Sequence, residues 1–153
     1  MDEKRLTFED FPVGATMSFG DHVVTEDDAF AFATLFDPQA IHLDKDAANA
    51  GPLDGLSISG WHTCSILMRM MCDSFLLRST SLGSPGIETL SWKVPVRPGD
   101  RLHARWTCVS ARTSEKRTDL GICVFDYEVF NDNDDVVLTA RVTHFFGREL
   151  EPS

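Results

Sequence analysis

The chain has 153 residues, of which 42% are hydrophobic and 25% are charged, and this predicts one globular domain spanning residues 1–153. Its formal net charge of -10 argues against binding to nucleic acid or to an anionic membrane surface. The longest apolar segment is interrupted by Arg69 and Asp73, so we expect no membrane-spanning helix.

Features at the N-terminus and the cysteines indicate a cytoplasmic protein. Met1-Asp2-Glu3-Lys4-Arg5 has no apolar stretch behind it, so we expect no signal peptide. The four cysteines form no CxxC pair and lie in apolar runs, which is typical of buried, reduced thiols.

The first elements along the chain are predicted to be a strand and a helix. Residues 1–15 read as irregular, and residues 16–24 as a strand. Thr25 opens the helix, because its hydroxyl can cap the first turn and Asp28 stands three residues on, as in a capping box.

An acid and a histidine stand where this helix stops. Pro38 disfavours helical geometry at Asp37, so Asp37 should lie at the helix terminus and His42 in the loop just after it. We expect residues 43–58 to be loop, with a short helical turn at residues 46–48.

The longest helix is predicted to run from Ser59 or Gly60 to about Leu77. Apolar side chains cover most of its circumference, which is typical of a core helix, and we interpret its methionines as core filler. We expect an ion pair at i, i+4 on its narrow polar stripe, which consists of His62, Ser65, Arg69 and Asp73.

Four strands are predicted to follow this helix. A Ser/Gly/Pro loop at residues 79–86 comes first, and alternating apolar residues then predict strands at 89–96, 101–108, 122–130 and 136–146. Their order predicts an α+β fold in which an antiparallel meander curls around the long helix.

Asp37 and His42 are the best candidates for chemistry. An acid/base pair beside a helix N-terminus can move protons, while the backbone N–H groups there can hold an oxyanion on a carbonyl substrate. Each residue also has a structural explanation: Asp37 can satisfy backbone groups at a helix end, and His42 can be a buried, hydrogen-bonded histidine. Ser59 can cap the helix or shape the site, and Gly60 can admit a ligand or make a tight turn.

Five sequence blocks, in order, resemble the MaoC-like dehydratase family, which includes the (R)-specific enoyl-CoA hydratases. The likeness extends from Phe8 to Phe146. The blocks are Val24-Thr25-Glu26-Asp27-Asp28, Phe36-Asp37-Pro38-Gln39, Ile41-His42-Leu43-Asp44, Ser59-Gly60-Trp61-His62-Thr63 and Pro95-Val96-Arg97-Pro98-Gly99-Asp100.

This resemblance implies a hot-dog fold, in which a curved antiparallel sheet wraps a long central helix. It implies a catalytic dyad at Asp37 and His42, and a thioester oxygen bound at the N–H of Gly60 with Ser59 beside it. It further implies a homodimer. We expect no metal, because the histidines on the predicted strands lie apart from one another without a carboxylate cluster at ligand spacing, and no cofactor except the coenzyme A of the substrate. The hydratases usually carry Asn-Pro inside the Asp-to-His loop, where this chain has Gln39 and Ala40.

The expected reaction is reversible addition of water to a 2-enoyl-CoA. Two alternatives remain open at this point: a thioesterase on the same fold, and a non-catalytic acyl-CoA-binding module. The sequence assigns neither the direction of the reaction nor the acyl chain, because the side chains that line the pocket depend on the fold.

Overall fold

The computed structural model describes residues 3–149. Within this range, no helix is long and apolar enough to cross a membrane. The helices and strands are, in chain order, η1 (Phe8–Asp10), β1 (Thr16–Val23), α1 (Glu26–Phe36), α2 (Ala40–Leu43), α3 (Lys45–Ala50), α4 (Gly60–Ser74), η2 (Leu76–Arg78), β2 (Ser81–Trp92), β3 (Arg101–Thr113), β4 (Leu120–Phe130) and β5 (Val136–Gly147).

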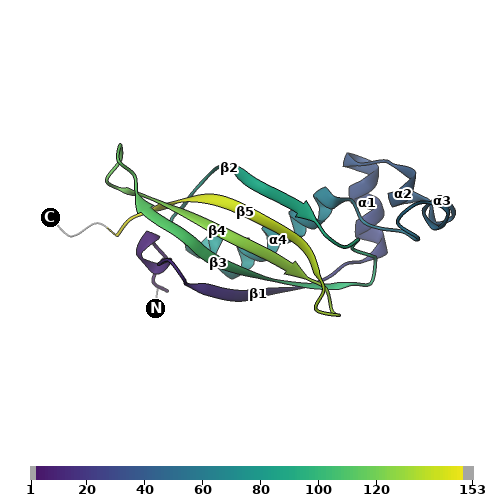
Figure 1. The fold of residues 1–153 in the computed structure, drawn as a ribbon, viewed down its shortest axis with the longest axis horizontal. Coiled ribbons are helices and arrows are strands. Elements are labelled where there is room, and N and C mark those ends of the chain that lie inside the picture. The colour runs from purple at the N-terminus through teal and green to yellow at the C-terminus, as the bar shows by residue number, and fades with distance from the viewer. Residues whose placement is uncertain (1–2, 150–153) are drawn as a thin grey trace.

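The five strands form one antiparallel sheet in the order β1-β3-β4-β5-β2 (Figure 1). The predicted meander is correct for β3, β4 and β5 but wrong for β2, which pairs with β5 and not with β3. A crossing from β2 to β3 spans three inter-strand spacings, about 14 Å. Residues 93–100 can reach about 26 Å when extended, so the chain can cross to the far side of β4.

Strand β2 also begins earlier and ends earlier than predicted. The predicted loop at residues 79–86 is wrong from Ser81 onward, because this Ser/Gly/Pro segment pairs with β5 through an irregular register. Gly83 and Gly86 have positive φ angles of 102° and 155° at the shifts in register. β2 lies at an edge of the sheet, where Pro85 and bulges are tolerated.

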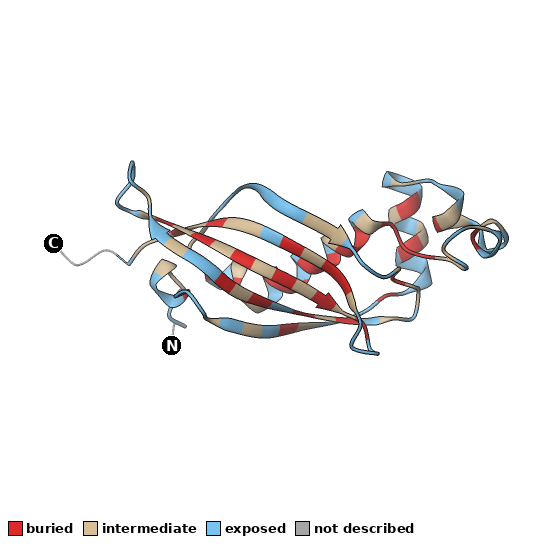
Figure 2. Cartoon of the chain, in the orientation of Figure 1, coloured by how far each residue is buried: buried red, intermediate tan, exposed pale blue. Residues whose placement is uncertain are grey.

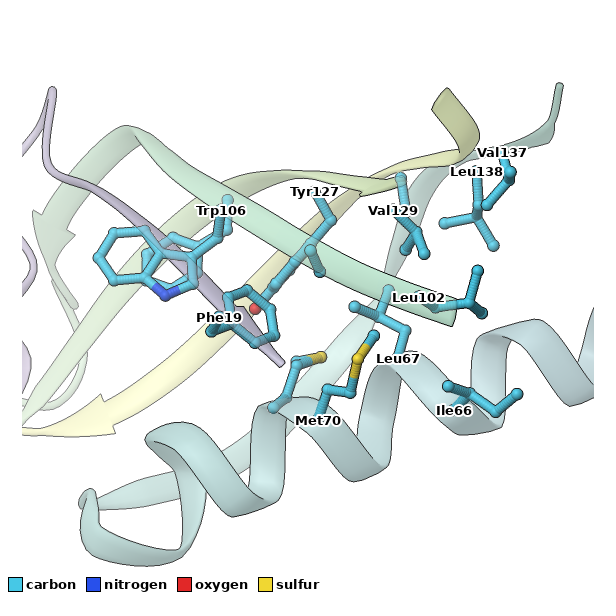
Figure 3. Packing of buried hydrophobic residues seen from close by; sticks show 14 of the residues in the cluster. Phe19, Ile66, Leu67, Met70, Leu102, Trp106, Tyr127, Val129, Val137 and Leu138 are labelled. Carbon is cyan, nitrogen blue, oxygen red and sulfur yellow. The ribbon is translucent and has the colours of Figure 1, made fainter. Parts of the chain in front are cut away.

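Buried residues alternate with more exposed ones along β3 and β4, so one row of side chains in each of these strands belongs to the core (Figure 2). In β4 this row is Cys123, Phe125, Tyr127 and Val129, all at most 1% exposed. Figure 3 shows side chains of the sheet and of α4 meeting between the two layers. The core is therefore a single layer between the sheet and one helix.

The helix α4 supplies the other side of this core. It ends at Ser74, earlier than the predicted Leu77, and the 3-10 turn η2 follows. Its buried side includes Ile66, Leu67, Met70 and Met71. The predicted ion pair is confirmed, since Arg69 Nε lies 3.0 Å from Asp73 Oδ2.

The prediction that α4 is covered on most sides is wrong for two large side chains. Trp61 is 59% exposed and Met68 is 50% exposed, so Met68 is not core filler. A sheet of five strands covers only one side of the helix. Gly20 allows close contact on that side, because a Cβ atom there would collide with the side chain of Met70.

The cysteines are all free, as predicted, but the predicted burial holds only for two of the four. Cys108 and Cys123 are buried between the sheet and Phe11, and Cys64 and Cys72 are half-buried. Burial raises the pKa of the Cys123 thiol to about 12, so this thiol is inert at neutral pH.

Candidate active site

The helices α1, α2 and α3 gather at one end of the sheet and bring Asp37 and His42 together (Figure 1). Thr25 caps α1 by accepting a 3.1 Å hydrogen bond from Asp28 N, as predicted. Asp37 is the C-cap of α1, also as predicted, and its N–H donates to Ala33 O at 2.9 Å. The predicted loop position of His42 is wrong: one helical turn, α2, begins at Ala40 and turns His42 back toward Asp37.

His42 is fixed in orientation from both sides of its ring. Nδ1 lies 2.7 Å from the carbonyl oxygen of Ser57, and Nε2 lies 3.2 Å from Asp37 Oδ2. The two side chains are only 7% and 15% exposed. A carbonyl oxygen can only accept, so Nδ1 carries a proton, and Nε2 is the ring nitrogen that faces the carboxylate.

Asp37 Oδ2 and His42 Nε2 face each other at hydrogen-bonding distance. At 3.2 Å the two atoms can share one proton directly. A water molecule bound beside the pair can hydrogen-bond to both side chains. This arrangement is suited to hold one water and to take a proton from it.

The carboxylate of Asp37 has further neighbours that favour its ionised form. Gln39 Nε2 donates to Oδ1 at 2.6 Å. The hydroxyl of Ser59 lies near the carboxylate, although it has no hydrogen-bond partner of normal geometry. Burial alone would raise the pKa of Asp37, but Gln39, Ser59 and His42 together hold the pKa below its ordinary value.

The loop before α4 carries the carbonyl that holds His42, and Arg97 fixes this loop. The guanidinium donates to Leu53 O at 2.6 Å and to Leu56 O at 3.1 Å. Arg97 N–H donates to Asp100 Oδ2 at 2.9 Å, so the turn before β3 is held as well. Ser57 follows directly after this anchored segment.

The N-terminus of α4 faces the same cavity as the dyad. Ser59 is the N-cap residue and Gly60 begins the helix. Within residues 3–149, the N–H groups of Gly60 and Trp61 have no hydrogen-bond partner. Such free groups at the positive end of a helix can bind an oxyanion.

One cavity of about 420 Å³ joins these groups. Asp37, His42, Gln39, Ser57 and Gly60 all line it. Three of the four predicted site residues, Asp37, His42 and Gly60, thus lie together at its wall. The fourth, Ser59, lies behind the wall: it is 1% exposed, and its side chain makes no capping bond, so the predicted cap is wrong.

Gly60 is required for a contact that neither sequence interpretation anticipated. A Cβ atom at this position would lie 2.5 Å from the indole of Trp92. The indole Nε1–H also donates to Gly60 O at 2.9 Å. Trp92 therefore packs directly on the first residue of α4.

His62, on the polar stripe of α4, does not line this cavity. Its ring stacks on Phe32 at 4.7 Å, with 5° between the planes. Burial lowers the pKa of His62. Among residues 3–149, no three His, Cys, Asp or Glu side chains gather at metal-binding distances.

Comparison with known proteins identifies the family. The model of the MaoC like domain matches residues 10–122. The chain belongs to the MaoC-like family. A MaoC-like dehydratase from Rhodospirillum rubrum is 35% identical, with a TM-score of 0.87 over 95% of this chain and 99% of the other. The predicted family and the predicted hot-dog fold are thereby confirmed.

Two further relatives span nearly the whole chain. The R-hydratase PhaJ1 from Pseudomonas aeruginosa is 18% identical, with a TM-score of 0.72 over 97% of this chain and 92% of its own, and shows the same fold. The uncharacterized protein YdeM of Bacillus subtilis is 25% identical over 144 residues, which are 94% of this chain and all of YdeM. The family-level match supports an enzyme of the hydratase or dehydratase type.

Proposed function

We propose that this MaoC-like protein catalyses the reversible addition of water to a 2-enoyl-CoA thioester. The observation that carries the proposal is the acid/base pair of Asp37 Oδ2 and His42 Nε2, 3.2 Å apart in a cavity that also contains the free N–H of Gly60. The first two atoms can hold a water, and the third can hold the thioester oxygen.

The chemistry follows from these three groups. One water donates its two O–H groups to Asp37 and His42, and its oxygen attacks C3 of the enoyl chain. As the C3–O bond forms, the C2=C3 electron pair moves toward the thioester oxygen, where the N–H of Gly60 stabilises the enolate. The O–H bond of the water breaks, the dyad takes the proton, and C2 receives a proton from the dyad as the enolate collapses. Dehydration reverses each step.

The state of Asp37 at neutral pH suits this role. Its lowered pKa keeps it ionised, so it can accept from water. The N–H of Gly60 stabilises negative charge on the thioester oxygen, and this charge develops only as water adds to the double bond. Such a donor lowers the activation barrier of hydration more than it strengthens substrate binding. No metal or redox group takes part in the proposed steps, and coenzyme A enters only as part of the substrate.

The test follows 2-butenoyl-CoA by enoyl absorbance and, in parallel, by release of free thiol. Loss of absorbance without thiol release is the expected result. Thiol release without hydration would instead identify a thioesterase, and binding without turnover would identify an acyl-CoA-binding module. Either of these outcomes overturns the proposal.

We also expect the protein to form a homodimer through the edge of β2. Residues 82–89 of this strand are exposed, including Leu82 at 57% and Ile87 at 54%. An exposed strand edge with apolar side chains favours pairing with another strand, and a second copy would extend the sheet.

A further inference from the structure

A second cavity lies between α4, β2 and β5 and is open to the surface at Met68 and Ile87. Its volume is about 370 Å³, and its walls are mostly apolar, with Cys64, Leu67, Met71, Leu90 and Val142 among them. Cys64 lies one helical turn after Gly60 on α4, and Leu90 lies two residues before Trp92 on β2. The two cavities therefore follow each other along the same helix and the same strand.

Trp92 is the residue of β2 that leads from the second cavity to the first, and it is 46% exposed. It lines the first cavity, and its indole is in contact with Gly60 through the 2.9 Å hydrogen bond to the carbonyl. Trp61, at 5.4 Å between ring centroids and 81° between planes, packs edge-to-face against it. Cys64, on the wall of the second cavity, lies within hydrogen-bonding reach of the indole. The indole is thus held from the helix side by three residues.

We propose that Trp92 is a specificity-determining residue that closes the reaction cavity and restricts this protein to short-chain 2-enoyl thioesters. This inference rests on the proposed function, because it places the thioester oxygen at Gly60. An acyl chain that extends from Gly60 along α4 meets Trp92 before it reaches the apolar second cavity. One helical turn, from Gly60 to Cys64, is about 6 Å, or roughly four carbon–carbon bonds of about 1.5 Å. The acyl groups that fit have about four to six carbons.

The first experiment compares 2-butenoyl-CoA with 2-decenoyl-CoA in the wild type and in Trp92→Ala. One methylene in an apolar pocket changes specificity by about 10-fold or more. The wild type should therefore prefer the four-carbon substrate by at least about 100-fold in kcat/KM. Trp92→Ala should reduce that preference by at least about 10-fold, through a gain on the long substrate. A wild type that uses both substrates equally, or a variant with an unchanged ratio, overturns the proposal.

A second variant tests whether the gain uses the second cavity. Leu90→Trp fills that cavity, so adding it to Trp92→Ala should abolish the gain on 2-decenoyl-CoA. Leu90→Trp alone is the matched control and should leave 2-butenoyl-CoA kinetics unchanged within about twofold. If Trp92→Ala does not fold, Trp92→Phe replaces it, because the smaller phenyl ring can still pack on Gly60. Trp92→Phe should also raise kcat/KM on 2-decenoyl-CoA, but by less than Trp92→Ala. A long-chain gain that survives Leu90→Trp shows another route and overturns the assignment.

Binding separates a failure of this inference from a failure of the proposed function. Calorimetry with saturated butanoyl-CoA and decanoyl-CoA needs no turnover. The wild type should bind the short thioester more tightly, and Trp92→Ala should reverse or remove that order. Chain-length selection without hydration would refute the proposed reaction and leave the role of Trp92 intact. Hydration without chain-length selection would refute the role of Trp92 and leave the proposed reaction intact.

Discussion

The buried pair of Tyr127 and His144 predicts a specific loss of stability in acid. Tyr127 OH lies 2.8 Å from His144 Nε2, and the two residues are 1% and 4% exposed. Burial lowers the pKa of His144 from 6.5 to about 4 and keeps the ring neutral in the folded protein. The unfolded chain, in contrast, protonates this histidine near its ordinary pKa of 6.5.

The sign and the size of the effect follow from these two pKa values. Between pH 6.5 and about 4 the unfolded state binds more protons, so the free energy of unfolding falls as the pH falls. From pH 7 to pH 4.5 this one residue removes about 2.5 kcal/mol, since one pKa unit corresponds to about 1.4 kcal/mol. That is a large part of the stability of a small domain.

Urea unfolding at pH 7 and pH 4.5 measures this loss. The control is Tyr127→Phe/His144→Leu, which removes both polar groups so that neither is left buried without a partner. The carboxylates titrate alike in both proteins and cancel in the comparison. The wild type should lose about 2.5 kcal/mol more than the double variant between the two pH values. Equal losses in the two proteins would refute the assignment of a neutral, buried His144.

Four further outcomes are expected. Asp37→Asn and His42→Ala should each lower hydration by about 100-fold or more while circular dichroism stays native, and near wild-type turnover in either variant would contradict the dyad. Gln39→Ala should move the acid limb of kcat/KM to higher pH, because the pKa of Asp37 rises when the 2.6 Å hydrogen bond is lost; an unmoved limb would exclude Gln39 from this role. Gly60→Val should lower the melting temperature as well as turnover, because its Cβ meets Trp92 at 2.5 Å, and an unchanged melting curve would argue against that contact. Light scattering at micromolar concentration should give twice the chain mass of 17.1 kDa, and a monomer would refute the expected homodimer.

Local sequence signals predicted the parts of the site that neighbouring residues determine. Thr25 and Pro38 mark the start and the end of α1, and these rules depend only on residues a few positions away. The five-residue spacing from Asp37 to His42 was visible for the same reason. The helical turn α2, which brings His42 back toward Asp37, was not predicted. A four-residue helix has too few residues to show a periodic pattern.

The parts that depend on distant residues could not be read from the chain. The carbonyl of Ser57 reaches His42 across 15 residues, and Trp92 reaches Gly60 across 32. The alternation that places Trp92 in a strand says nothing about which helix its side chain touches. The neighbour of β2 in the sheet was missed for a similar reason: hydrophobic periodicity identifies a strand but carries no information on its partner.

The position of β2 connects assembly with chemistry. This strand is a free edge of the sheet, and its residues Leu90 and Trp92 also belong to the walls of the two cavities. A second copy paired along this edge would hold the strand in place, and separation of the copies would release it. For such a dimer, specific activity depends on enzyme concentration and falls on dilution below the dissociation constant, even though each chain keeps its own Asp37 and His42.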